Sequence, residues 1–206
     1  MTQIFHITHL TNLVSITATG RLVSDRAAQA IDCVRIGHQH IKDRRLNRRV
    51  PLSPGGFVGD YVPFYFAPRS PMLYAINKGA VLGYAGGQAE VVHLVSSAEA
   101  IEAADLEWVF TDGHADMPPL TSFYDDLGDL GKIDWSVMNS RYWFDSANHP
   151  DRERRRQAEF LVHDFCPWEL IGEIGVYNRE AAENVHKIMA NVVHKPEIRI
   201  EAGWYY

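Results

Sequence analysis

Cysteine is scarce in this sequence, and long apolar runs are missing. The two cysteines, Cys33 and Cys166, stand alone and not in the paired spacing of zinc ligands. Such scarcity is typical of proteins that fold in a reducing compartment. No run approaches the roughly 18 apolar residues that cross a membrane. The opening stretch, MTQIFHITHL, lacks the basic and apolar regions of a secretory signal. We therefore expect a cytoplasmic protein with no membrane segment.

Motifs for metals and phosphates are also missing. The histidines are scattered, and His6 and His9, three residues apart in a predicted strand, point to opposite faces and would not share one metal ion. The glycines of SPGGFVG, residues 53–59, are followed by neither a lysine nor a helix, so they form no standard phosphate loop. No G-x-S-x-G elbow occurs. We expect no bound metal.

What is present is an ordinary globular composition with unevenly distributed charge. The 206 residues, 46% of them hydrophobic, suffice for one core without disulfide or metal, and the formal net charge is −6. Residues 21–49 hold eight Lys or Arg against three Asp, residues 99–134 hold ten acids against one lysine, and DRERRRQ at 151–157 is basic again. Clustered positive charge on an acidic chain favours a local anion site, although such runs can also be solvated helix faces.

The hydrophobic periodicity predicts mixed strands and helices in one domain over residues 1–206. Strands are expected at IFHITH (4–9), YVPFYF (61–66), EVVHLV (90–95), AEFLVHDF (158–165), IGEIGVY (171–177), EIRI (197–200) and GWYY (203–206). Helices are expected from Thr11 or Asn12 to Gly20, in the basic part of 21–57, from Pro71, from Ser96 or Ser97, and over 179–193. Residues 112–157 are irregular, which in a compact domain indicates function or disorder. Without a strict βαβ rhythm, the expected class is α+β.

Two stretches are candidate functional sites. Residues 61–74, YVPFYFAPRSPMLY, hold more aromatics and prolines than a strand core requires, which points to a bound ligand. Glu159 follows a run of arginines at the start of an apolar strand, so it is either a surface charge or an acid positioned in a basic pocket. His6 is either a hydrogen-bonded strand histidine or a donor to a ligand that lies across the sheet.

Three segments together resemble the DarT family of DNA ADP-ribosyltransferase toxins. They are FHITHLTNL (5–13), RRLNRRVPLSPGGFVGDYVPFYFAPRSPMLYAI (44–76) and RRRQAEFLV (154–162). The first and last also carry the general pattern of the ADP-ribosyltransferase fold, in which a strand histidine, an aromatic and a glutamate surround NAD. The resemblance implies a split antiparallel or mixed β-sheet core flanked by helices. It also implies that NAD is the ADP-ribose donor and that no metal is needed.

The resemblance assigns roles to residues of this sequence. Glu159 orients a ribose hydroxyl and offsets the charge of an oxocarbenium-like transition state. Arg49, or its neighbour Arg48, holds the NAD phosphates or assists at the acceptor base. His6 binds the adenosine-side ribose, and Tyr65 or Phe66 stacks near the nicotinamide ring, although strand alternation makes about half of these aromatics plain core. The implied contacts of NAD are His6, Thr8, Asn12, Arg48, Tyr65, Phe66 and Ser70.

The irregular segment, about 112–157, is expected to select the acceptor. In this fold the loop before the catalytic glutamate has that role, and here it combines aromatic rings, which stack on exposed bases at about 1–3 kcal/mol each, with arginines that neutralise phosphates. The alternative is that its aromatics form a small satellite core. The residues expected to bind nucleic acid are Tyr142, Trp143, His149, Arg152, Arg154 and Arg155.

The expected activity is that of a glycosyltransferase. ADP-ribose passes from NAD to a base of single-stranded DNA, thymine rather than guanine, and nicotinamide is released. Two alternatives stay open: transfer to RNA, protein or a phosphate group, or a non-catalytic module that only grips a single strand. The resemblance implies a toxin whose partner is a macrodomain antitoxin that removes the modification. We expect a monomer, since a strand-binding groove needs no second copy of the chain.

Overall fold

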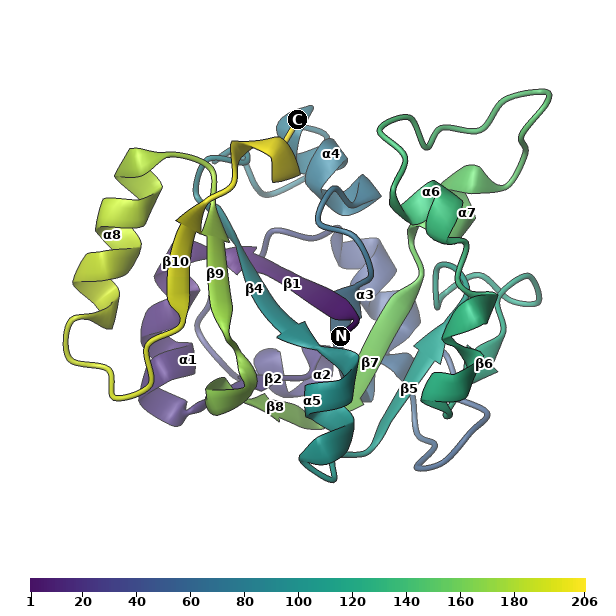
Figure 1. The fold of residues 1–206 in the computed structure, drawn as a ribbon, viewed down its shortest axis with the longest axis horizontal. Coiled ribbons are helices and arrows are strands. Elements are labelled where there is room, and N and C mark those ends of the chain that lie inside the picture. Colours follow the sequence, from purple (N-terminus) through teal and green to yellow (C-terminus); the bar gives the residue numbers. More distant parts are fainter.

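The computed structural model describes all 206 residues and is built on one eight-stranded mixed sheet (Figure 1). All neighbouring strands are antiparallel except β9 and β10, which are parallel. A second, two-stranded sheet pairs β2 (Arg21–Val23) with β8 (Phe165–Pro167). This confirms the expected mixed sheet. The order across the large sheet is β10 (Glu197–Ile200), β9 (Glu173–Val176), β4 (Val91–Ser97), β1 (Gln3–His9), β3 (Tyr61–Tyr65), β7 (Glu159–His163), β5 (Trp108–Thr111) and β6 (Phe123–Tyr124).

Short helices surround the sheet. The longest, α8, lies beside β9 and β10 at the left of Figure 1, while α6 and α7 lie at the opposite side, near β7 and β5. No helix has the length and apolar character to cross a membrane. The α-helices are α1 (Leu13–Thr19), α2 (Asp25–Ala28), α3 (Gln39–Arg45), α4 (Pro71–Asn77), α5 (Ala98–Ala103), α6 (Trp135–Met138), α7 (Arg152–Arg156) and α8 (Arg179–Met189). Five 3-10 turns cover Leu10–Asn12, Val58–Asp60, Leu127–Lys132, Trp168–Leu170 and Ala202–Trp204.

Local sequence signals set most helix ends. Gly20 ends α1 in the left-handed region, at φ 68°, where a side chain would be strained. Ser70 begins α4 by accepting a hydrogen bond from the Leu73 amide, with Pro71 in the first turn, and Ser97 begins α5 in the same way. The predicted helix starts at Pro71 and Ser97 are therefore confirmed.

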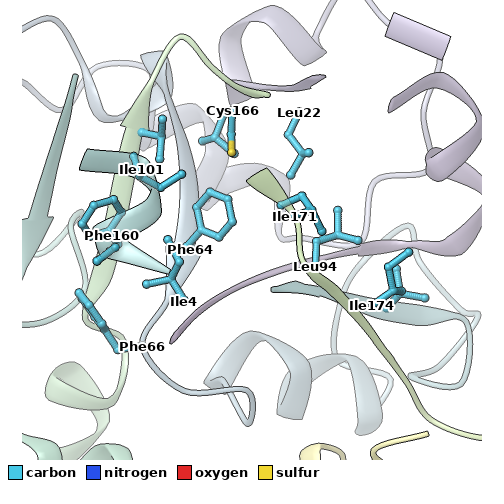
Figure 2. Close-up of a cluster of buried hydrophobic side chains, with 14 of the residues drawn as sticks. Ile4, Leu22, Phe64, Phe66, Leu94, Ile101, Phe160, Cys166, Ile171 and Ile174 are labelled. Atoms are coloured by element: carbon cyan, nitrogen blue, oxygen red, sulfur yellow. The ribbon is translucent and has the colours of Figure 1, made fainter. Parts of the chain in front are cut away.

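The main core lies on one face of the sheet and is formed by a cluster of 28 buried residues (Figure 2). Phe64 of β3 lies opposite Phe160 of β7, and both side chains are fully buried. Ile4, Leu94 and Ile174 extend this apolar layer across the sheet. Because strand residues alternate between faces, the neighbours Tyr65 and Glu159 project to the other side.

The sheet is splayed between β1 and β3. β1 pairs with β4 along seven residues, but with β3 only where Phe5 meets Tyr65. Where the backbones separate, the His6 side chain bridges the two strands, because its Nδ1 donates a hydrogen bond to the Pro63 carbonyl of β3 at 2.8 Å. The Pro63 carbonyl is thereby satisfied without closing the sheet. The split leaves room for a ligand between the two strands.

Two strand predictions were wrong. AEFLVHDF breaks at Asp164, whose φ of 61° ends β7 and sends the chain into β8 of the second sheet. GWYY is no strand; a 3-10 turn ends at Trp204, and the Tyr205 hydroxyl donates to the Val91 carbonyl at 2.8 Å. Both segments are rich in β-forming residues, and tertiary contacts decide their conformation. The sequence analysis did not predict β5, because this short strand follows closely on the helix expected from Ser96 or Ser97.

Candidate active site

A cavity of about 480 Å³ lies at the split between β1 and β3. Its walls come from β1, β3, α1, α2, α3, the start of α4 and the segment 31–38. The first residue of β7, Glu159, also reaches it. The wall residues with polar or charged side chains include His6, Thr8, Asn12, Arg21, Asp25, Arg35, Lys42, Arg45, Tyr65, His114, Gln157 and Glu159.

Glu159 is the buried acid of this cavity. Glu159 is only 1% exposed, which rules out the interpretation of this residue as a surface charge. One carboxylate oxygen accepts a hydrogen bond from Arg45 Nη1 at 2.8 Å, and the other accepts from the Ala115 amide at 3.1 Å. The Glu159 amide donates to Thr111 Oγ1 at 3.1 Å. These contacts fix the carboxylate beside the cavity, because a buried charge is stable only when it is paired and hydrogen-bonded.

Arg45, the last residue of α3, connects Glu159 to a line of alternating charges. Its Nε lies 3.3 Å from Asp25 Oδ2, and Lys42 Nζ donates to Asp25 Oδ1 at 2.9 Å. Burial alone would lower the pKa of Arg45, but Glu159 and Asp25 outweigh it and raise that pKa. Arg45 Nη2 is buried and has no partner. That nitrogen is therefore a spare donor beside the carboxylate.

The structure does not bring Arg48 or Arg49 to the cavity. The Arg49 guanidinium lies 5.3 Å from the centre of the Phe57 ring, and that of Arg48 lies 5.8 Å from the Phe123 ring. Both follow the end of α3, where the chain turns away from the cavity. Arg45 takes the place expected for them. Its one sequence signal is the three-residue spacing from Lys42, which puts both on one helix face.

His6, Thr8 and Asn12 lie in the cavity wall as expected. Asn12 donates to Thr8 Oγ1 at 3.0 Å and to the Val34 carbonyl at 2.9 Å, and it accepts from the Val34 amide at 2.9 Å. It thereby ties the segment 31–38 to β1 and α1. Burial lowers the pKa of His6, so its ring is neutral near pH 7, with the proton on the nitrogen that binds the Pro63 carbonyl. Their contact with a dinucleotide stays a prediction.

The expected aromatic contacts divide between cavity and core. Tyr65 lines the cavity opposite Glu159. Burial, and then the charge of Glu159, raise the pKa of its phenol. Phe66 does not reach the cavity: it is 4% exposed and packs edge-on against Phe110 and Trp135. Strand alternation is the cause. Ser70 is likewise absent from the cavity wall, since its hydroxyl caps α4.

His114 is a wall residue that the sequence did not reveal. It is 9% exposed, and its Nδ1 accepts a hydrogen bond from the Asp116 amide at 3.1 Å. Burial lowers its pKa, so the ring is neutral, and Nε2 carries the proton. It lies in the irregular segment, where no periodicity identifies a buried position.

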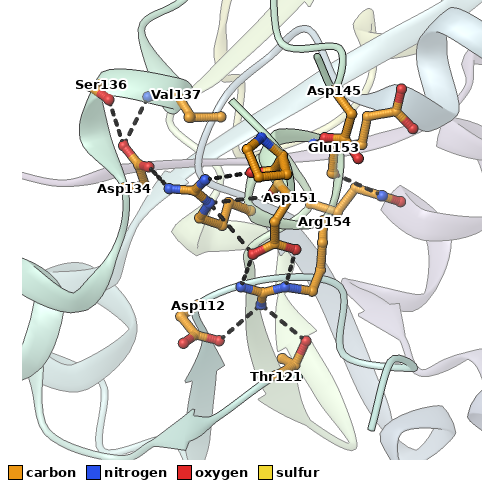
Figure 3. A network of polar contacts seen from close by, with 12 residues as sticks. Asp112, Thr121, Asp134, Ser136, Val137, Asp145, Asp151, Glu153 and Arg154 are labelled. Carbon is orange, nitrogen blue, oxygen red and sulfur yellow. Dashed lines mark hydrogen bonds and ion pairs between the residues drawn. The ribbon is translucent and has the colours of Figure 1, made fainter. Parts of the chain in front are cut away.

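Two arginines expected to bind nucleic acid are instead paired within the protein (Figure 3). Arg154 holds both oxygens of Asp151, at 2.7 and 2.8 Å, and also reaches Asp112. Arg155 Nη1 donates to Asp134 Oδ2 at 2.6 Å. Their charge is neutralised by acids of the same irregular segment, which explains why basic and acidic runs alternate there. They brace the segment and offer little charge to a partner.

The remaining residues of that set have different positions. Trp143 is 3% exposed, and its indole nitrogen donates to the Tyr206 hydroxyl at 2.8 Å, so the satellite-core interpretation is the correct one for this ring. Arg152 donates to Ser140 Oγ at 2.9 Å and to the Tyr142 carbonyl at 2.6 Å. The side chains of Tyr142 and His149 are exposed, and whether they contact nucleic acid stays a prediction.

The family model of DarT, described as ssDNA thymidine ADP-ribosyltransferase, matches residues 5–206. The chain belongs to the DarT family. It is 43% identical over 207 residues to a DNA ADP-ribosyl transferase of Thermus sp. (strain 2.9), and the alignment covers 100% of this chain and 96% of that protein. DarT enzymes are NAD-dependent DNA ADP-ribosyltransferases, and this chain is one of them.

Solved DarT structures have the same fold. Thermus sp. 2.9 DarT in complex with ADP-ribosylated ssDNA superposes with a TM-score of 0.94, at 43% identity over 100% of this chain and 96% of that one. The complex of the same protein with NAD+ gives 0.88, at 40% identity over 100% and 98%. A DNA ADP-ribosyl transferase–DNA ADP-ribosyl glycohydrolase fusion protein of Thermosipho africanus is 27% identical; the match covers 92% of this chain and 46% of the fusion. The expected fold is confirmed.

Proposed function

We propose that this DarT enzyme transfers ADP-ribose from NAD to a thymine base of single-stranded DNA and releases nicotinamide. The observation that carries the proposal is the buried Glu159–Arg45 pair, which leaves a spare Arg45 donor in the cavity at the split sheet. The relatives solved with NAD+ and with ADP-ribosylated ssDNA support the donor and the acceptor. The wording of the family model, ssDNA thymidine, supports thymine over guanine.

The reaction needs a carboxylate beside the ribose that loses nicotinamide. As the bond between nicotinamide and C1′ breaks, its electrons leave with nicotinamide, and positive charge develops on the ribose. Glu159 accepts a hydrogen bond from a ribose hydroxyl and offsets that charge. A ring nitrogen of the base then bonds to C1′, and the proton of that nitrogen passes to water. Arg45 holds Glu159 in position, and its free Nη2 donates to an oxygen of the reacting groups.

NAD lies along the cavity wall in this proposal. Tyr65 packs near the nicotinamide, because its ring faces the cavity beside Glu159. His6, Thr8 and Asn12 contact the adenosine side. For the diphosphate we favour Arg35 over Arg48 and Arg49, since Arg35 lines the cavity and the other two do not.

The biological setting is part of the same proposal. The segment 112–157 selects the acceptor, because it supplies His114 to the cavity and borders Glu159. We propose a cytoplasmic, monomeric toxin that is counteracted by a macrodomain antitoxin. The relative in which a transferase is fused to a DNA ADP-ribosyl glycohydrolase supports such a pairing.

Intact mass spectrometry of oligonucleotides tests the activity. Single and double strands of four base compositions are incubated with the enzyme and NAD. We expect a single ADP-ribose on thymine-containing single strands alone, with fragmentation locating it on the base. An adduct on guanine would overturn the choice of base. Nicotinamide release without any DNA adduct, together with labelling of RNA or protein, would overturn the acceptor.

A further inference from the structure

Outside the cavity, aromatic rings from three parts of the chain form one partly exposed surface. Tyr74 of α4 contacts Phe144 at 5.2 Å and Tyr206 at 5.0 Å between ring centres, and Phe144 stacks on the buried Trp143 at 4.3 Å. Phe144 is 43% exposed. Stacked rings with a free face fit unpaired bases, because every base has a π-face on which an aromatic side chain can stack.

The cations around these rings are unpaired. The Arg69 guanidinium lies 4.4 Å from the centre of the Tyr206 ring, its Nε is buried without an acceptor, and Lys78 Nζ lies 5.3 Å from the Tyr74 ring. Neither side chain has a carboxylate oxygen within 4.0 Å. Arg154 and Arg155, in contrast, are neutralised by Asp151 and Asp134.

A buried cation, Arg156, adds to this positive region. Arg156 also lacks a carboxylate partner; it donates to the carbonyls of Arg69, Val137 and Met138. Its pKa is lowered to about 10, chiefly by burial and additionally by Arg69. The region is thus electropositive on a chain whose formal net charge is −6, which suits a polyanion.

The aromatic surface is continuous with the active-site cavity through α4. Pro71 and Ala75 line the cavity, while Tyr74 and Lys78 belong to the aromatic surface. Successive residues of a helix are rotated by about 100°, so Tyr74 and Lys78 occupy the strip next to that of Pro71 and Ala75. A strand with one base in the cavity can therefore continue across α4.

We propose that Tyr74, Phe144, Tyr206, Arg69 and Lys78 form a flank site, which binds the nucleotides beside the target base in single-stranded DNA. A flanking base stacks on Phe144 and Tyr74, and its phosphate contacts Arg69 and Lys78. A duplex is excluded because its base faces are already stacked. The inference rests on the proposed function for the identity of the strand, but its test does not depend on the chemistry.

Fluorescence anisotropy of a labelled, mixed-sequence DNA single strand of about 16 nucleotides tests the flank site, with a strand of about 4 nucleotides for comparison. We expect Phe144→Ala to weaken binding of the long strand about 5- to 50-fold and of the short strand much less. Lys78→Gln should reduce the slope of log K against log salt by about 0.7, one phosphate contact. Leu82→Ala and Lys187→Gln, exposed side chains elsewhere, are the matched controls.

Equal binding of the long strand by Phe144→Ala, Lys78→Gln and their controls would overturn the flank site, whether or not the surface serves a protein partner. Oligonucleotide labelling is measured separately. If the wild type binds long strands through Phe144 and Lys78 but labels none, the flank site stands and the proposed acceptor falls. If the wild type labels DNA while both variants bind the long strand like wild type, the proposed acceptor stands and the flank site falls.

Discussion

The two arginine-rich stretches of this protein, residues 42–49 and 152–156, resemble each other in sequence and differ in what they do. In the first, one cation out of five, Arg45, is buried against Glu159, while Lys42 pairs with Asp25 in the cavity wall and Arg44 pairs with Asp116. In the second, Arg154 and Arg155 bind acids of the irregular segment and Arg156 binds carbonyls. The first stretch therefore places a cation beside the buried carboxylate, and the second holds the irregular segment together.

The difference shows that a run of charge does not reveal its own partner. Asp25 and Glu159 come from distant parts of the chain, and they select Arg45 from among the five because it ends α3 on the cavity side. The acids that neutralise Arg154 and Arg155 belong to the same irregular segment, 112–157. The position of the partner acid, rather than the local run of charge, therefore decides whether an arginine lies in the cavity or holds a loop segment together.

The largest effect is expected from breaking the buried pair. Arg45→Met leaves Glu159 buried without its cation, so we expect a loss of about 3 kcal/mol in unfolding free energy. ADP-ribose transfer should fall at least about 100-fold. Arg49→Met, which removes an exposed cation of the same stretch, should have the stability and activity of wild type. Urea unfolding and oligonucleotide labelling measure the two effects. Equal loss of activity in both variants would contradict the assignment.

A smaller effect is expected from removing Arg154, which pairs with acids of the irregular segment. Arg154→Gln breaks the paired contacts with Asp151 and the reach to Asp112, at about 2 kcal/mol for hydrogen bonds between charged groups. We expect the rate of ADP-ribose transfer to DNA to fall more than the rate of nicotinamide release in the absence of DNA, because Arg154 holds the segment that is proposed to select the acceptor. Arg179→Gln removes an exposed i,i+4 ion pair as control. A variant that loses both activities in proportion would show that Arg154 supports the whole cavity instead.

The acid dependence of stability separates Asp25 from unpaired acids. Burial acts to raise the pKa of Asp25, but Lys42 and Arg45 outweigh it, and the pKa lies below its ordinary 3.8. The stability from Asp25 is present above that ordinary value and is lost as the pH falls through the lower folded value. Asp25→Asn should therefore be less stable than wild type at pH 7, with a difference that shrinks below about pH 4.

Urea unfolding across this pH range measures that difference. Asp145→Asn is the control, since Asp145 contacts only the Glu153 amide. If the difference in unfolding free energy between wild type and Asp25→Asn stays constant from pH 7 to below pH 4, the charge of the Asp25 carboxylate is not what stabilises its contacts with Lys42 and Arg45.

The smallest effect is expected at Tyr142. Its side chain is exposed and its ring packs on no other ring, so Tyr142→Ala should leave stability within about 0.5 kcal/mol. If the ring stacks on a base, the KM for DNA rises a few-fold and that for NAD does not change. Unchanged kinetics for both substrates would remove Tyr142 from the DNA-binding residues.

Much of the sheet could be predicted from sequence, since β1, β3 and β4 are short runs rich in β-branched and aromatic residues. The break at Asp164 and the turn at Trp204 could not, because each lies in a run that would suit a strand and is decided by distant contacts. Phe66 was misplaced for a simpler reason. Residues adjacent in a strand point to opposite faces, so Tyr65 and Phe66 could not both face one ligand.

The site was predictable where the family resemblance assigns a residue that lies on a strand of the split sheet. His6, Thr8, Tyr65 and Glu159 all lie in the cavity wall as that resemblance implies. Arg45 and His114 were not identified, since the first depends on where α3 ends and the second on the path of an irregular segment. Trp143 illustrates the same limit: nothing nearby in sequence indicates that Tyr206 would cover it.

The most direct test of the account is the rate of ADP-ribose transfer by Glu159→Gln, which preserves the shape of the side chain and one of its two accepted hydrogen bonds, from Arg45 or from the Ala115 amide, while removing the charge. Labelling of a thymine-containing single strand is followed by intact mass spectrometry at saturating NAD, with thermal unfolding as the check on folding. We predict a folded variant whose transfer rate falls at least about 100-fold. Transfer at the wild-type rate would contradict the claim that Glu159 is the catalytic carboxylate.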